Sequence, residues 1–554
     1  MNIRIILLTV VLCMGLFSLS ATSPAQIPLS SPLYEEIDLL YRLSGLSLPS
    51  TSRPWNTYEA LALLDAIDKD TPYENLRTSA HARIAEKTYN EMNETFSYRI
   101  TPAVTLESYI HTNDEEFTSY DDWIYSYDER QPLLDLTLSM QFSSSFLFET
   151  SLQVGAGAFM EDVDTEKAFE EWGIGAILKQ GDAVWVPSAT LYRRTFSSNI
   201  PLLLDSPLEP DFPRHSQLTY AGPWWAISLG RGVYSWGGGE SGNLVIGDHI
   251  SNHTGLSASL FNPKAKIQLL YLFFSGFEQQ SNRIFLGHRF EFNPTPWARI
   301  SISENVMAKQ DGLSLQYLDP TYIYHNIFDS DQINSIASIE ADITPLPRLS
   351  IHGQFAIDQL QLASETASTA DALAYILGGS YSWSALRGFL TFTLETASTD
   401  PSFYRREDVD FLVARDLIKN QEHLRPVIID YLGYEWGSDS KVYQLKLSYL
   451  LPQKLSVDYS VTFHRQGELT YHAAHHVEDD EENNEGIPTI QGPSPYGEDI
   501  TERLIIGLGA TYQTAIPNLE LYGRAYWIGS RIYHRSTRKS DAFAEDVQLV
   551  VGIT

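Results

Sequence analysis

Aromatic and acidic residues lie together in two long polar stretches of the sequence, residues 113–130 and 160–172. The ring faces of Trp and Tyr stack on the apolar faces of sugars, and carboxylates accept hydrogen bonds from hydroxyl groups. The pattern therefore predicts carbohydrate-binding chemistry, with four aromatic candidates: Trp123, Tyr125, Tyr127 and Trp172. The alternative is that these rings belong to a membrane-interface girdle or to ordinary solvated loops.

A third polar stretch, residues 466–502, is the most acidic part of the chain. From Val477 to Glu502 it has nine acidic residues and no Lys or Arg. Nearby side chains have the chemistry of divalent-cation ligands, and a cation could bridge the loop to an anionic glycan, but no compact spacing fixes a metal geometry; they are His472, His475, His476 and Asp479. We therefore expect a self-repelling, solvated loop, and we predict neither a metal site nor a cofactor.

An acidic surface repels an anionic glycan, so such a ligand would need bridging cations or basic side chains to hold it. Paired arginines occur at Arg193 and Arg194 and again at Arg405 and Arg406. We take Arg193 and Arg194 as carbohydrate-binding candidates beside the aromatic residues. A neutral glycan would need neither cations nor arginines.

Composition excludes several classes of function. The 554 residues carry a formal net charge of −32, which argues against a nucleic-acid partner because phosphate would be repelled. The single cysteine excludes a disulfide framework and a multi-cysteine metal site. No nucleophile elbow, zinc-protease motif or phosphate loop is present, and none of the 70 acidic residues stands out as a catalytic carboxylate. We predict a protein without enzymatic activity.

Residues 1–25 have the pattern of a secretory signal peptide. Arg4 supplies the charged start, residues 5–19 form an apolar core, and Ser23 and Ala25 occupy the small-residue positions before a cleavage site. The apolar run is short for a membrane-spanning helix, although a buried helix or a membrane anchor is the alternative. This segment predicts export from the cytoplasm.

Residues 26–95 carry helix signals. Asn56 followed by Glu59 resembles a capping box, and Thr71 followed by Pro72 resembles an N-cap and a first helical proline. Apolar residues recur at helical spacing after each of these signals. We expect three short amphipathic helices that plug or brace a larger body, because about 60 residues are marginal for an independent domain.

From residue 96 to residue 554 the hydrophobic period changes to two. Leu134, Leu136 and Leu138 alternate with polar residues, and similar runs of about ten residues recur to the end of the chain. Such strands place one face against lipid and the other against a polar lumen. With roughly 25 residues per strand and connection, we expect an all-β transmembrane barrel of about 18 antiparallel strands. A soluble β-sandwich or propeller is the alternative.

Three groups of motifs follow one another in the middle of the chain. They are a glycine-rich segment at 225–239, two strand-like runs at 288–304, and a Tyr-Leu-Asp-Pro and Tyr-His-Asn pair at 317–326, and a hairpin-like stretch at 331–358 comes after them. In order and spacing they resemble the Wzi-like capsule assembly family of outer-membrane barrels, with Asp319 where that family has Asn. The resemblance covers roughly residues 30–360. The motif positions, which we expect to be mainly structural, are Trp236, Gly237, Gly239, Glu304, Asp319, Pro320, Tyr324, His325 and Asn326.

The resemblance implies an outer-membrane barrel with N-terminal helices on the periplasmic side. It also implies a lectin-like, non-catalytic role in holding capsular or other exopolysaccharide on the cell. The expected partners are a surface polysaccharide, outer-membrane lipid and the barrel-insertion machinery of a diderm bacterium, with loops exposed at the cell surface. Two alternatives remain open: a porin or solute channel, and a surface antigen or adhesin.

Overall fold

The computed structural model describes most of the chain. The described residues are 23–68, 72–86, 96–117, 122–126, 129–154, 195–200, 213, 215–250, 253–274, 282–309, 319, 323–324, 333–359, 371–406, 409–416, 427–470 and 493–554. The expected signal peptide, apart from its last three residues, lies outside them.

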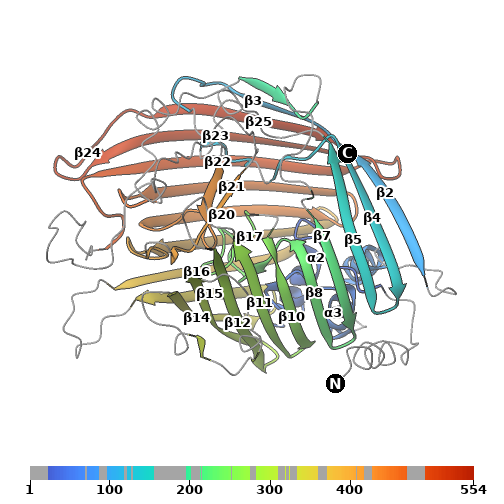
Figure 1. Cartoon of the computed structure of the whole chain (residues 1–554). Helices are drawn as coiled ribbons and strands as arrows, with labels where there is room; N and C mark the ends of the chain where they lie inside the picture. The colour runs from blue at the N-terminus through green and yellow to red at the C-terminus, as the bar shows by residue number, and fades with distance from the viewer. Residues whose placement is uncertain are drawn as a thin grey trace, which may run out of the picture.

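Antiparallel strands form a closed barrel (Figure 1). The ring closes through one bent segment, in which β2 (Ser97–Val104) pairs with β4 (Leu134–Ser143) and β3 (Leu106–His111) pairs with the C-terminal strand β25 (Ala544–Ile553). With β2 and β3 counted as one, the described barrel has eighteen strands, which confirms the expected fold. The other barrel strands are β5 (Phe146–Val154), β7 (Ser216–Gly222), β8 (Trp225–Gly232), β10 (His253–Asn262), β11 (Ala265–Phe274), β12 (Arg283–Thr295), β13 (Ala298–Lys309), β14 (Ile333–Leu346), β15 (Leu349–Gln359), β16 (Ala372–Ala385), β17 (Gly388–Thr399), β20 (Ser440–Leu451), β21 (Leu455–Gln466), β22 (Asp499–Gln513) and β23 (Glu520–His534).

Short strands add local pairings to this wall. β1 (Ser52–Arg53) pairs with β9 (Ser235–Trp236), and β18 (Leu412–Asp416) pairs with β19 (Val427–Tyr431), so both pairs stand apart from the ring. β6 (Phe196–Ser198) pairs with β3, and β24 (Lys539–Ser540) pairs with the C-terminal end of β23.

Each barrel strand has one apolar face and one polar face. On β4, Ser139 and Gln141 are buried in the interior, whereas Phe142 is exposed on the outside. On β25 the outward Val551 is 61% exposed. A belt of exposed apolar side chains suits a lipid-facing surface, because these groups gain nothing by facing water. None of the helices in the described residues is long and apolar enough to cross a bilayer.

The two ends of the barrel differ in the length of their connections. At one end, tight turns join consecutive strands, as at Pro296–Trp297 between β12 and β13 and at Leu386–Arg387 between β16 and β17. At the other end the connections are long, for example the 32 residues between β21 and β22. We refer to these as the short-turn end and the long-connection end.

The described residues include three short helices, as the sequence predicts: α2 (Leu33–Leu43), α3 (Thr57–Asp65) and α4 (Glu74–Glu86). They lie inside the ring (Figure 1). The predicted cap of α3 is present, since the Asn56 Oδ1 atom accepts a hydrogen bond from the Glu59 backbone N at 2.8 Å. The apolar stripes of the three helices pack into one cluster with Phe389 and Leu450 of the barrel wall. We call residues 23–68 and 72–86 the plug.

Candidate functional site in the barrel interior

Two buried arginines on the barrel wall hold the centre of the plug. The Nη2 atoms of Arg289 on β12 and Arg299 on β13 both donate to the Thr51 hydroxyl, at 3.0 and 3.1 Å. Arg289 also makes a bidentate pair with Glu340 on β14, with N–O distances of 2.5 and 2.9 Å. Bidentate guanidinium–carboxylate pairs are both strong and directional. The pair with Glu340 fixes Arg289 so that it can hold Thr51.

A lysine from the wall forms a second buried contact with the plug. The Lys266 Nζ atom on β11 lies 2.8 Å from Glu59 Oε1 on α3 and 2.7 Å from the Ser52 carbonyl oxygen. Burial raises the pKa of the Glu59 carboxyl, and the Lys266 ammonium opposes this shift. Breaking such a buried pair on one side strands the other charge in a region of low dielectric.

The plug lies at the short-turn end of the barrel. The Tyr58 hydroxyl donates to the Ser144 carbonyl oxygen at 2.6 Å, and the Ser47 N donates to the Pro296 carbonyl oxygen at 2.9 Å. Both acceptors belong to tight turns between strands. Arg42 on α2 reaches the wall further round, where it donates to the hydroxyls of Ser350 and Ser382 at 2.8 and 2.9 Å.

The connection between β8 and β10, residues 233–250, folds into the lumen instead of leaving it. Its strand β9 pairs with β1 of the plug, and the Trp236 Nε1 atom donates to Gln268 Oε1 at 2.9 Å. Gly237 has a φ of +135°, and a Cβ at this position would overlap the Asn243 side chain. A Cβ on Gly239 would overlap the Gly242 carbonyl oxygen. The glycines thus allow a close approach that larger residues would prevent.

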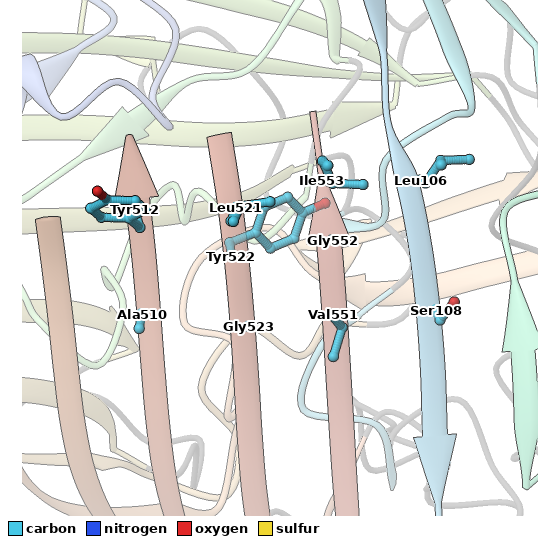
Figure 2. A pocket seen from close by; sticks show the side chains of 10 residues that line it. All are labelled: Leu106, Ser108, Ala510, Tyr512, Leu521, Tyr522, Gly523, Val551, Gly552 and Ile553. Carbon is cyan, nitrogen blue, oxygen red and sulfur yellow. The ribbon is translucent and has the colours of Figure 1, made fainter. Parts of the chain in front are cut away.

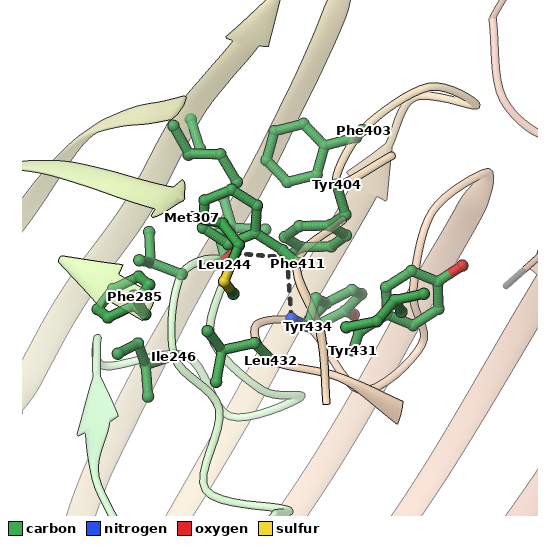
Figure 3. Packing of buried hydrophobic residues seen from close by; sticks show 14 of the residues in the cluster. Leu244, Ile246, Phe285, Met307, Phe403, Tyr404, Phe411, Tyr431, Leu432 and Tyr434 are labelled. Carbon is green, nitrogen blue, oxygen red and sulfur yellow. Dashed lines mark hydrogen bonds between the residues drawn. The ribbon is translucent and has the colours of Figure 1, made fainter. Parts of the chain in front are cut away.

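Two further segments, residues 400–406 with 409–411 and residues 430–438, fold inward against the first one. Together with 233–250 they form what we call the inner segments. Figure 3 shows their side chains packed against Phe285 and Met307 of the barrel wall. The Tyr404 hydroxyl links the segments, since it donates to the Leu244 carbonyl oxygen at 2.5 Å and accepts from the Tyr434 backbone N at 2.8 Å. Dense apolar packing therefore occupies part of the space that water would fill in an open pore.

Polar contacts also tie the inner segments to the wall. Glu395 on β17 accepts hydrogen bonds from the backbone N atoms of Glu240 and Ser241 at 2.8 and 2.7 Å. The His352 Nε2 atom lies 2.5 Å from the same carboxylate. One lumen-facing glutamate thus anchors the tip of the 233–250 segment.

A histidine joins two of the inner segments. The His249 Nε2 atom lies 2.9 Å from the Tyr431 carbonyl oxygen and 3.6 Å from Asp430 Oδ1. Burial alone would lower the pKa of His249, but the Asp430 carboxylate outweighs it and raises this pKa to about 9. The imidazolium form is therefore favoured at neutral pH.

A buried glutamate organises the closing seam of the barrel. Glu107 on β3 accepts hydrogen bonds from three tyrosine hydroxyls: from Tyr109, from Tyr125 at 2.8 Å and from Tyr522 at 2.8 Å. The Arg130 guanidinium lies 4.1 Å from the ring centre of Tyr109 and 4.9 Å from that of Trp123. Trp123 and Tyr125, two of the predicted sugar-binding aromatics, are thus packed onto the inside of the seam.

One pocket of about 490 Å³ lies on the outer surface at the same seam, near the short-turn end (Figure 2). Its lining is mainly apolar and comes from β3, β22, β23 and β25, including Leu106, Tyr512, Leu521 and Val551. These side chains belong to the exposed apolar belt. The pocket therefore forms part of the lipid-facing surface and lies apart from the interior.

The structure describes some of the predicted carbohydrate-binding residues. Trp123 and Tyr125 are each only 4% exposed, with their rings against the Glu107 and Arg130 cluster. Arg405, which the sequence offers as a further basic group, is 2% exposed and faces Asp410 at 3.6 Å. The remaining candidates lie outside the described residues: Tyr127, Trp172, Arg193 and Arg194.

The described motif positions lie on several different elements. Trp236, Gly237 and Gly239 lie in the 233–250 segment, and Glu304 on β13 accepts a hydrogen bond from the Tyr324 backbone N at 3.1 Å. Tyr324 is buried and Asp319 is exposed. Pro320, His325 and Asn326 lie outside the described residues. Residues 471–492 of the acidic loop also lie outside them. Among the described residues, no cluster of His, Cys, Asp and Glu could hold a metal ion.

Sequence reasoning did not single out the residues that hold the interior together, namely Glu107, Lys266, Arg289 and Glu395. Their signal was present, because each is a charged residue at a lumen-facing position of an alternating strand. Burial of a charge requires a partner. A search for lumen-facing charges would have found the four residues without naming their partners.

No protein-family model matches the sequence, and no curated protein matches it. Among solved structures, the chain is similar to Wzi of Escherichia coli, an outer membrane protein involved in group 1 capsule assembly and described as a carbohydrate-binding β-barrel. The similarity covers 96% of this chain and 98% of Wzi, with a TM-score of 0.53 and 13% sequence identity. The resemblance to a Wzi-like barrel is thus confirmed for the fold.

Two further solved structures have lower similarity. OccD3 (OpdP) of Pseudomonas aeruginosa has a TM-score of 0.37 and 11% identity over 81% of this chain and 90% of its own. OmpT of Vibrio cholerae has a TM-score of 0.33 and 8% identity over 83% of this chain and 97% of its own.

Proposed function

We propose that this protein is a non-catalytic outer-membrane barrel that holds surface polysaccharide at the cell surface during capsule or exopolysaccharide assembly. The observation that carries the proposal is the packed interior. The plug is fixed to the wall by the buried Lys266–Glu59 pair and by the Arg289 hydrogen bond to Thr51. The inner segments are fixed to it by the Glu395 carboxylate, which accepts from two of their backbone N atoms. Contacts of this kind are expensive to break, so they favour a permanent filling over a gate that opens for each solute.

The proposal assigns an orientation to the barrel. In bacterial outer-membrane barrels the short turns face the periplasm and the long loops face outward. By this rule the plug lies on the periplasmic side, and residues 122–126 and 129–131, which precede β4, lie on the outer side. Outer-membrane lipid and the barrel-insertion machinery are then further partners.

The similarity in fold to Wzi, which is described as a carbohydrate-binding barrel, supports a glycan as the ligand of this protein. The aromatic candidates supply the stacking surface: Trp123, Tyr125, Tyr127 and Trp172. Trp123 and Tyr125 face Arg130 and Glu107 in the described conformation. Binding through them requires Trp123 and Tyr125 to move outward and exchange these contacts for sugar. Arg193 and Arg194 would then pair with acidic sugars.

A solute channel is the rival function, and one observation favours it. Lumen-facing charged side chains on other parts of the interior remain exposed, including Arg524 on β23 and Glu240 and Glu435 on the inner segments. Charges lining an aqueous path select ions by sign. A continuous path past the plug would be needed for transport.

Two measurements on the purified full-length protein separate these functions. A glycan array should give binding to at least one bacterial exopolysaccharide, and Trp123→Ala should weaken it by about tenfold through loss of stacking. Trp297→Ala, at an exposed tryptophan on the short-turn end, is the matched control and should bind as the unchanged protein does. In planar bilayers we expect no steady single-channel current. Large, steady currents together with an empty array would refute the proposal.

A further inference from the structure

Two arginines share one glutamate on the outer surface of the barrel. The Arg465 Nε atom on β21 lies 3.1 Å from Glu502 Oε1 on β22, and the Arg531 Nη2 atom on β23 lies 2.8 Å from Glu502 Oε2. The two guanidinium groups together outweigh the single carboxylate. We call Arg465, Glu502 and Arg531 the outer triad, and it carries one net positive charge.

Strand alternation places the triad on the lipid-facing side. Arg465 shares its face of β21 with the exposed Tyr459, and Glu502 shares its face of β22 with the exposed Leu508. The intervening residues face inward, since Asp458 lies beside the lumen-facing Lys446. On this outer surface the side chain of Arg465 is 29% exposed and that of Arg531 is 30% exposed.

Aromatic rings flank the triad. The Arg465 guanidinium lies 5.3 Å from the ring centre of Tyr533, and the Arg531 guanidinium lies 4.4 Å from that of Phe543. The Phe543 ring in turn lies 6.5 Å from that of Trp527. Aromatic rings beside cationic side chains mark the level at which a barrel passes from hydrocarbon to headgroups.

More basic residues continue from the triad to the tip of the β23–β25 hairpin. Residues 531–540 include four Lys or Arg residues and no Asp or Glu, in a chain whose net charge is −32. Arg538 and Lys539 are exposed, and no carboxylate among the described residues pairs with either of them. Of the nearby carboxylates, Asp499 and Asp541 contact His534, at 2.6 and 3.4 Å, and Glu498 accepts a hydrogen bond from the Ser536 backbone N at 2.7 Å.

The triad and the hairpin tip lie at the long-connection end, just beyond the apolar belt. We propose that this patch binds the phosphate groups of a phosphorylated glycolipid in the outer leaflet. Planar guanidinium groups match the geometry of phosphate, and the patch faces sideways toward lipid headgroups. The proposal requires only the barrel and the orientation that places its long connections outward, and it is independent of which glycan the protein binds.

The proposal can be tested with the full-length protein in nanodiscs that contain bis-phosphorylated lipid A. Retained lipid is counted by native mass spectrometry. The double variant Arg465→Gln and Arg531→Gln should lower the affinity for lipid A by about thirty-fold, at roughly one membrane-proximal basic group per factor of five to six. Glu502→Gln, which removes the only negative charge of the triad, should strengthen retention.

Controls separate the sources of the phosphate chemistry. Arg387→Gln with Lys454→Gln, at exposed turns of the short-turn end, should retain lipid A as the unchanged protein does. Dephosphorylated lipid A should bind weakly and should not respond to the triad variants. The proposal is overturned if the triad variants leave lipid A retention unchanged, or if both forms of lipid A bind alike. It is also overturned if millimolar inorganic phosphate displaces the lipid, or if the variants lose binding to anionic polysaccharide instead of to lipid A. Slower gel migration of the unheated protein would reveal a misfolded barrel, and Arg538→Ser with Lys539→Ser at the exposed tip then supplies the test.

Discussion

Tyr522 reaches past Gly552 to donate a hydrogen bond to Glu107, with an O–O distance of 2.8 Å. The three residues belong to three neighbouring strands, β23, β25 and β3, so this contact crosses the C-terminal strand and ties both of its neighbours together. A Cβ on Gly552 would overlap the Tyr522 ring. The missing side chain of one residue therefore makes room for the side chain that closes the barrel.

Gly552→Ala should destabilise the barrel by about 1–3 kcal/mol, because the added methyl displaces the Tyr522 ring and leaves Glu107 with one donor fewer. Gly523→Ala is the matched control, since its Cβ would meet no heavy atom closer than 3.7 Å. The temperature at which the folded band disappears on unheated gels measures the difference. Equal temperatures for the two variants would contradict the role assigned to this contact.

Removing one partner of the Lys266–Glu59 pair should loosen the plug while leaving the barrel wall intact. Lys266→Met strands the Glu59 carboxylate and should cost the plug about 3–5 kcal/mol. The double variant Lys266→Met with Glu59→Gln should recover most of that loss, because no unpaired charge remains. Limited proteolysis within residues 23–68, compared with the barrel strands, is the readout. If the double variant were cut as readily as the single one, the charge argument would fail.

The contact between His249 and Asp430 should weaken in alkaline solution. The folded pKa of His249 is raised to about 9, above its ordinary value near 6.5. Its stabilising contribution is therefore fully present below pH 6.5 and is lost as the pH rises through 9. Amide exchange of residues 244–250, compared with His249→Gln at each pH, should show extra protection at pH 7 that disappears by pH 10. If the ratio of the amide exchange rates of the two proteins stays constant from pH 7 to pH 10, this linkage is contradicted.

The sequence predicts the wall of this molecule better than its interior. Alternation such as that of Leu134, Leu136 and Leu138 fixes which side chains face lipid, because the period of a strand is two. The capping box of Asn56 and Glu59 is equally local, and both predictions are confirmed. Local patterns were sufficient wherever a feature depends on residues a few positions apart.

The interior depends instead on pairs that are far apart along the chain. Ser52 pairs with Trp236, and Arg289 contacts Glu340 across 51 positions. Alternation indicates that such side chains face the lumen, but the identity of a partner depends on the register of the whole ring. The burial of Trp123 follows from Arg130 and the seam, and nothing in the acidic loop sequence distinguishes a packed ring from an exposed one.

The Tyr404 hydroxyl provides the most direct test of the packed interior. It bridges the Leu244 carbonyl oxygen and the Tyr434 backbone N, so Tyr404→Phe leaves two buried polar groups without this partner while keeping the ring. The loss should loosen the inner segments by about 1–3 kcal/mol and produce brief current bursts in planar bilayers where the unchanged protein is silent. Tyr443→Phe removes a hydroxyl from an exposed residue of β20 and should remain silent. If Tyr404→Phe is equally silent while its inner segments exchange amide protons faster, the plug alone seals the lumen and the inner segments serve another purpose. If neither property changes, the bridge does not hold the segments together.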